Sequence, residues 1–182
     1  MRTRARSTIV SGFLALGVGT SAVGQSFVNF ESPQIHPIDV TPDGTFVLVT
    51  NTADNRLAIL DRLDAGNLRL RTSVPVGLEP VSVRALDETT AWVVNHLSDS
   101  VSIVDLNEGR VVATLQTGDE PADVVFAGSP RRAFVSISQE NRIMVFDPAN
   151  PDLPPVSVPV EGQEPRALAT DGSKVFSAIF EA

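Results

Sequence analysis

The chain has 182 residues, of which 42% are apolar and 20% charged, a composition typical of a globular protein rather than a disordered or collagen-like one. It contains no cysteine, which excludes disulfides, thiolate metal ligands, cysteine nucleophiles and covalently attached c-type haem within these residues. The 14 basic residues against 22 acidic ones give a net charge of −8, and such a surface disfavours binding to nucleic acid.

The first 24 residues have the order of a secretory signal. Three arginines fall within the first six residues, an uncharged and mostly apolar run follows at 8–20, and Ala22 and Gly24 place small residues at the two positions that a signal peptidase reads. A membrane anchor is the alternative interpretation, but this run is shorter than the ~20 residues that a spanning helix needs. The sequence therefore predicts a Sec-type signal peptide over 1–24, cleaved before Gln25, and a periplasmic or extracellular protein.

From residue 36 onward, one unit recurs every 41 to 44 residues. The units cover about 36–78, 79–119, 120–163 and, in part, 164–182. Each begins at an X-Pro pair, with prolines at positions 37, 80, 121 and 165. In the last three units the preceding residue is glutamate, with a glycine two residues before it: Gly77, Gly118 and Gly162. We expect the prolines to fix the loop that enters each unit and the glycines to adopt positive φ.

Each complete unit contains four short segments of strand composition, separated by turn residues. The first segments are apolar, at 38–40, 81–85, 122–126 and 167–169. The second are the most apolar, at 46–51, 91–96, 133–138 and 175–180. The third end in aspartate, at 56–61, 100–105 and 142–147, and the fourth close the units at 68–76, 110–116 and 155–160. Four strands in about 40 residues are typical of a propeller blade, so the sequence predicts an all-β fold, a β-propeller of four-stranded blades.

The second segments indicate that both faces of a blade are covered. A sheet with one wet face alternates apolar and polar residues along each strand. Val47-Leu48-Val49 and Trp92-Val93-Val94 do not alternate. Blades sandwiched between neighbouring blades account for this pattern.

The repeat resembles that of the YVTN-family β-propellers. In that family a strand ending Val-Thr-Asn precedes a Val-x-Val-Ile-Asp strand, a Val-Val-Ala-Thr-Ile strand and a Val-Gly-x-x-Pro turn, and FVLVTN, SVSIVD, VVATLQ and VPVGLEP are similar to these. The resemblance covers about 36–182 and is specific to the repeat, not to an activity. It implies a propeller of a family whose members are often exported and in many cases have no assigned reaction. Unit three departs from the pattern, with Ser138 where Asn51 and Asn95 stand, and unit one lacks the glycine before its proline.

The units do not complete a ring. Closed propellers have about 4–8 blades, whereas this sequence holds three complete units and the first two strands of a fourth. We expect it to be the N-terminal part of a longer protein; a half ring closed by dimerisation is the alternative. The segment 25–35 contains a short alternating run at 26–30, which we expect to complete the last blade of the ring.

Polar residues after the second segments are candidates for a ligand site on one rim: Asn51, Asn95, His96 and Ser138. The alternative is structural, since asparagine often caps a turn through its amide, and for the asparagines we favour it. His96 is the most interesting of the four, because it stands where a ligand would enter.

Two sets of acidic residues also recur. The glutamates before proline would form an acidic rim able to bind a cation or a basic partner, with a merely solvated surface as the alternative: Glu79, Glu120 and Glu164. The aspartates that end the third segments are expected to accept backbone N–H groups in Asx turns: Asp61, Asp105 and Asp147.

No catalytic or metal-binding set is visible. The two histidines, His36 and His96, are too few for a mononuclear metal site, which usually needs three or four ligands. The chain has no Gly-x-Ser-x-Gly elbow, no phosphate-binding loop and no EF-hand loop. We therefore assign no catalytic residue, no metal and no cofactor to this segment, and haem would enter only through a downstream region.

The sequence as a whole predicts an exported propeller that acts as a binding scaffold for a protein, a cell-surface polymer or a small ligand. Nucleic acid is not an expected partner, and no membrane span is expected after signal cleavage. The alternative is the propeller domain of a periplasmic redox protein, because similar propellers carry haem d1, copper or quinone cofactors. A lactonase-like hydrolase is a weaker option, since it rests on fold analogy alone.

Overall fold

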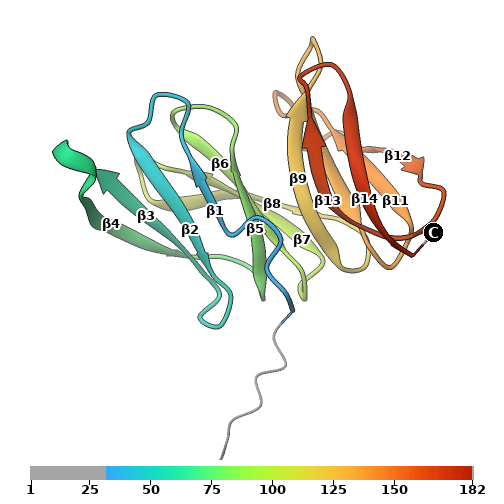
Figure 1. The fold of residues 1–182 in the computed structure, drawn as a ribbon, viewed down its shortest axis with the longest axis horizontal. Coiled ribbons are helices and arrows are strands. Elements are labelled where there is room, and N and C mark those ends of the chain that lie inside the picture. Colours follow the sequence, from blue (N-terminus) through green and yellow to red (C-terminus); the bar gives the residue numbers. More distant parts are fainter. Residues whose placement is uncertain (1–31, 182) are drawn as a thin grey trace, which may run out of the picture.

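A computed structural model describes residues 32–181 (Figure 1). The predicted signal peptide and the alternating run at 26–30 lie outside the described residues. In this described part, almost all regular structure is β-strand, and the exception is one 3-10 turn, η1 (Asp64–Gly66). Within residues 32–181, no helix has the length and apolar character needed to cross a bilayer.

The strands form successive antiparallel sheets, each in chain order. Blade one contains β1 (Ile38–Val40), β2 (Phe46–Asn51), β3 (Arg56–Arg62) and β4 (Leu68–Pro75). Blade two contains β5 (Pro80–Ala85), β6 (Thr90–Asn95), β7 (Ser100–Asp105) and β8 (Arg110–Gln116). Blade three contains β9 (Pro121–Ala127), β10 (Arg132–Ile137), β11 (Arg142–Phe146) and β12 (Val156–Pro159). The described part of blade four is a pair, β13 (Gln163–Thr170) and β14 (Val175–Glu181).

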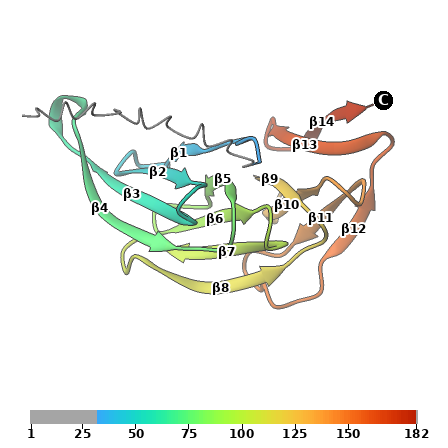
Figure 2. The ribbon, with the colours of Figure 1, turned by 90° about the horizontal axis from the view of Figure 1, so that it is seen from below.

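The blades fan out along an arc (Figure 2). The first strands, β1, β5, β9 and β13, lie on its concave side, and the last strands, β4, β8 and β12, lie on its convex side. This is the arrangement of a partial β-propeller, and it confirms the predicted all-β fold of four-stranded blades. It also places the inner strands of all four blades around one axis.

The core is divided into layers between blades. Side chains of β6 alternate between two layers: Ala91 and Val93 pack with blade one, whereas Trp92 and Val94 pack with blade three. Trp92 is fully buried, and its ring meets those of Phe126 and Phe146 edge-on, with centroids 5.6 and 6.1 Å apart. Both faces of blade two are therefore dry, as the non-alternating sequence predicts.

Strand pairing corrects the alignment of the second strands. Asn51 lies opposite Arg56, Asn95 opposite Ser100, and Ile137 opposite Arg142. Ile137, not Ser138, therefore stands where the two asparagines stand. Ser138 is instead equivalent to His96 and to Thr52.

Strand pairing also changes the alignment of the first unit with the other three. Blades two, three and four have a register break just after the Glu-Pro pair, whereas β1 and β2 pair without one. Ile38 lies opposite Val49, and the residue equivalent to it in blade two is Val83, opposite Val93. His36 therefore does not occupy the position of the glutamates, because the first unit lacks the bulge that follows them.

The expected positive φ is found at the glutamates rather than at two of the three glycines. Of the three glycines that precede a Glu-Pro pair, only Gly162 has a positive φ. The glutamates of these pairs all have φ between 50° and 56°: Glu79, Glu120 and Glu164. Gly77 is required for a different reason, since a Cβ there would come within 2.6 Å of the Asn95 side chain. Gly77 and Gly118 thus allow their loops to pack closely against the turn that follows the second strand of the same blade.

Candidate functional site

The most buried charge of the inner strands is Asp123, on β9. Its side chain is fully buried, and its Oδ2 lies 2.8 Å from Nδ1 of His36, the residue that precedes blade one. Arg84 on β5 places Nε 4.0 Å from Asp123 Oδ1. A buried carboxylate needs such partners, because an unpaired charge away from water is costly.

Asp123 also connects to blade four. Its Oδ2 accepts a hydrogen bond of 2.8 Å from the backbone N–H of Leu168 on β13. The same position in blade two is Ser82, whose hydroxyl donates to the Ala122 carbonyl of the next blade at 2.7 Å. Polar side chains at this level of the inner strands therefore join each blade to the next around the axis.

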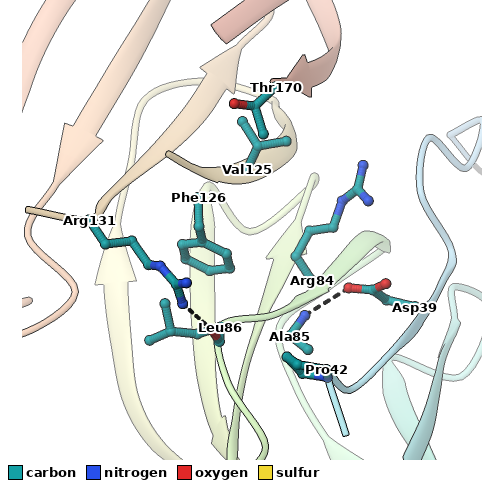
Figure 3. Close-up of a pocket in the computed structure, with 9 residues that line it drawn as sticks. All are labelled: Asp39, Pro42, Arg84, Ala85, Leu86, Val125, Phe126, Arg131 and Thr170. Carbon is teal, nitrogen blue, oxygen red and sulfur yellow. Dashed lines mark hydrogen bonds between the residues drawn. The ribbon is translucent and has the colours of Figure 1, made fainter. Parts of the chain in front are cut away.

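A cavity of about 260 Å³ opens at the next level of the axis (Figure 3). Its wall contains side chains from all four blades. Two of them, Asp39 and Arg84, occupy equivalent positions on β1 and β5, opposite Leu48 and Trp92. The complete lining is Asp39, Pro42, Arg84, Ala85, Leu86, Val125, Phe126, Arg131 and Thr170.

Some polar groups of this cavity have hydrogen-bond partners within the described part of the protein, and one does not. Asp39 Oδ2 accepts the N–H of Ala85 at 2.9 Å, and Arg131 Nη1 donates to the Leu86 carbonyl at 2.7 Å (Figure 3). Arg84 Nε is buried and has no hydrogen-bond partner among the described residues. The cavity thus presents a guanidinium with unused donor capacity, which suits an anionic or hydrogen-bond-accepting ligand.

The four predicted rim residues are placed in different surroundings. Asn51 is exposed, whereas the other three are buried: Asn95, His96 and Ser138. Asn95 Nδ2 donates to the hydroxyls of Ser100 and Ser102, at 3.2 and 2.9 Å. These contacts hold Asn95 within its own blade through serine hydroxyls rather than through the backbone groups of a turn.

His96 and Ser138 both reach backbone carbonyls. His96 Nδ1 lies 3.0 Å from the carbonyl oxygen of Pro121 in the next blade, and Ser138 Oγ donates to the Glu120 carbonyl at 2.7 Å. None of the four residues lines the axial cavity. A ligand-binding role for them stays a prediction.

The acidic rim residues each have their own partner. Glu79 Oε2 accepts the N–H of Ser32 at 3.3 Å, and Glu164 Oε2 accepts from Arg166 Nη2 at 3.1 Å. Glu120 Oε2 accepts from Gln139 and lies 3.6 Å from His96 Nε2. Cation or partner binding at this rim also stays a prediction.

The aspartates that end the third strands fall into two groups. Asp105 accepts the N–H groups of Asn107 and Glu108, at 2.9 and 2.8 Å, and Asp147 accepts that of Ala149 at 3.1 Å. Asp61 instead pairs with two arginines of β4, and the hydrogen bond from Arg69 is the main cause that lowers the pKa of its carboxyl. The expected turn geometry is therefore present at two of the three positions.

Sequence reasoning missed the axial site. Asp123 and Arg84 are the charged residues of two mostly apolar first strands, PADVVFA and PVSVRA. A charged residue inside a short apolar strand was the available signal, because such a charge must find a partner or line a cavity. Its pairing with His36, 87 positions earlier in the chain, appears only when the blades are arranged around the axis. Across residues 32–181, no group of three or more His, Cys, Asp or Glu side chains is placed to hold a metal ion.

Comparisons with solved structures support the fold. The chain is similar to hydrazine synthase from Kuenenia stuttgartiensis, with TM-score 0.71 and 23% identity, over 87% of this chain and 46% of that one. It is also similar to the periplasmic gluconolactonase PpgL of Pseudomonas aeruginosa, with TM-score 0.65 and 21% identity, over 79% and 46%.

A third similar structure is a 6-phosphogluconolactonase-like protein from Bacteroides uniformis, with TM-score 0.67 and 19% identity, over 81% of this chain and 48% of that one. The chain thus spans about half the length of these propellers. At such identities the likeness establishes the β-propeller fold alone. No protein-family model and no curated protein matches the chain.

Proposed function

We propose that this chain is part of an exported β-propeller of the YVTN repeat type that binds a ligand at its axis. The observation that carries the proposal is the cavity of about 260 Å³ between the inner strands, where Arg84 Nε lacks a partner among the described residues. Ligand pockets typically combine an apolar lining with a few polar groups that fix orientation. Phe126 and Val125 supply the apolar part here, and Arg84, Arg131 and Asp39 the polar part.

Export rests on residues 1–24, with their basic start, apolar run and small residues. Expression of the full-length protein in a Gram-negative host, followed by N-terminal sequencing of the periplasmic fraction, tests this part. We expect a mature protein that begins at Gln25. An uncleaved protein in the membrane fraction would contradict export by a cleavable signal.

The protein carries its own reporter for axial binding. Trp92 is the only tryptophan of these 182 residues and packs against Phe126, which lines the cavity. Titration of the full-length protein with neutral sugars, amines and carboxylates should therefore change Trp92 fluorescence when a ligand enters. Leu86→Phe, which narrows the cavity, should weaken that response, whereas Leu97→Phe at an exposed turn should not. A panel that leaves the fluorescence of Trp92 unchanged throughout would overturn axial binding.

Two other candidate functions are suggested by the activities named for similar structures. Two of those proteins are a gluconolactonase and a 6-phosphogluconolactonase-like protein, which favours a lactonase-like hydrolase as the second candidate. Release of acid from a gluconolactone, measured by pH-stat, tests it. Similarity to hydrazine synthase favours a redox role, with haem supplied from elsewhere in the protein. A full-length protein without a Soret band would exclude the haem-linked version.

A further inference from the structure

We propose that the axial cavity recognises a small ligand through a carboxylate or phosphate group held by Arg84 and Arg131. This rests on the proposed function, since it names the chemistry of the ligand at the same cavity. The two arginines are its cationic side chains, in a protein whose net charge is −8. They come from different blades, Arg84 from β5 and Arg131 from the turn between β9 and β10.

Arg84 supplies the stronger part of the argument. Its Nε is 4.0 Å from Asp123 Oδ1, beyond hydrogen-bond distance, and no described residue accepts from it. Asp123 already has closer partners in His36 Nδ1 and Leu168 N–H, each at 2.8 Å. No hydrogen bond from the two terminal nitrogens of Arg84 is found among the described residues, so the end of the guanidinium keeps its donors for an external acceptor. A carboxylate or phosphate matches these donors with two parallel hydrogen bonds.

Arg131 adds a second positive charge to the wall that carries Leu86 and Phe126. One of its terminal nitrogens, Nη1, is held by the Leu86 carbonyl at 2.7 Å. This bond orients the side chain along the cavity (Figure 3) and leaves the other nitrogen donors available.

The negative charge that faces the cavity is already engaged. Asp39 Oδ1 accepts the N–H of Val40 and its Oδ2 that of Ala85, each at 2.9 Å. These bonds hold the carboxylate against the backbone of β5, where Figure 3 shows it pointing to Ala85. Its free lone pairs can accept a hydroxyl of the ligand, whereas an oxyanion is directed to the arginines.

The test uses acetate and glycerol phosphate as probes, with glycerol as the neutral control, on the full-length protein at constant ionic strength in chloride. We expect at least one oxyanion probe to change Trp92 fluorescence and, at about tenfold excess over its Kd, to raise the Tm by about 3 to 6 °C. Glycerol should do neither. A response to acetate alone indicates a carboxylate ligand, and a response to glycerol phosphate alone indicates a phosphate ligand.

Variants separate this site from general charge effects. Arg84→Gln should weaken the oxyanion response by roughly 10- to 100-fold, the value of a charged hydrogen bond. Arg110→Gln removes the same charge from exposed β8, beside Glu108, and should leave the response unchanged. Arg131→Gln leaves the contacts of Asp123 intact. It therefore tests oxyanion binding by Arg84 and Arg131 even if Arg84→Gln fails to fold.

Three results would overturn the inference. The first is no response to either oxyanion, and the second is an equal loss in Arg84→Gln and Arg110→Gln. The third is unchanged oxyanion binding in Arg131→Gln, which would remove that residue from the site. If a neutral sugar changes Trp92 fluorescence while the oxyanions do not, the anion site is excluded and axial binding stands. If no probe of any charge has an effect, both fail.

Discussion

Trp92 in blade two and Phe176 in blade four occupy the same position in the repeat, yet their surroundings are opposite. Strand pairing places Trp92 opposite Arg84 and Phe176 opposite Ala169. Arg84 and Ala169 are equivalent, because each stands four residues after the proline that begins its unit. Trp92 is 0% exposed, whereas Phe176 is 55% exposed. Side chains at this position point toward the following blade, and none of the described residues covers blade four on that side. Burial in this fold is therefore decided by the neighbouring blade rather than by the residue's own strand.

The largest expected effect tests this comparison directly. Trp92→Ala should lower the free energy of unfolding by about 3–5 kcal/mol, because it leaves a cavity between blades two and three. Within the 182 residues alone, Phe176→Ala should cost less than about 1 kcal/mol, as for an exposed side chain. Urea unfolding followed by circular dichroism measures both. A cost at Phe176 as large as that at Trp92 would mean that this face is covered in the full-length protein.

The second prediction extends the comparison to charged groups. Asp123→Asn should lower the free energy of unfolding by about 3 kcal/mol, since it removes the charge of a fully buried carboxylate whose contact with the half-buried His36 joins two blades. Asp61→Asn disturbs an ion pair with exposed arginines of the outer strand and should cost under about 1 kcal/mol. The same urea titrations apply. Equal costs would contradict the view that contacts between blades dominate stability.

The third prediction compares two glycines of equivalent loops. Gly77→Ala should destabilise the protein by about 1–3 kcal/mol, because its new methyl group would meet Asn95, which is fully buried and held by two serines. At Gly118 the methyl group would meet the carboxylate of Glu140, an exposed side chain that can move. Gly118→Ala should therefore destabilise the protein less than Gly77→Ala does, and thermal unfolding of the two variants measures the difference. The reverse order would show that Asn95 gives way more easily than Glu140.

The smallest effect is expected where no neighbouring blade is involved. Hydrogen bonds within one turn, first that from the Thr45 hydroxyl and then that from Thr41, lower the pKa of Asp43 to about 2 from 3.8. A depressed folded pKa contributes stability above pH 3.8 that is lost as pH falls toward about 2. The Tm of the wild type should therefore fall more steeply over this range than that of Asp43→Asn. Parallel curves would show that the turn does not stabilise the folded carboxylate.

The sequence repeat made the blades predictable, whereas the residues of the axial site could not be predicted from it. β2, β7 and β8 have the predicted limits at both ends, because their apolar residues are bounded by clear turn residues. The alignment of units from prolines was wrong for His36, since a register break follows Glu-Pro in three blades and is absent in the first. A bulge of this kind depends on hydrogen bonding between strands and leaves no reliable mark in composition.

The sequence by itself determined the order of strands, their grouping into blades and the need for both faces of a blade to be covered, because these follow from local periodicity and turn residues. Only the tertiary structure decided which polar residues meet. His36 and Asp123 are 87 positions apart yet meet at the axis, and Arg84 and Arg131 belong to different blades yet line the same cavity. The physical reason is that contacts around the axis depend on how blades stack and on the register of each inner strand, neither of which is encoded in one short segment.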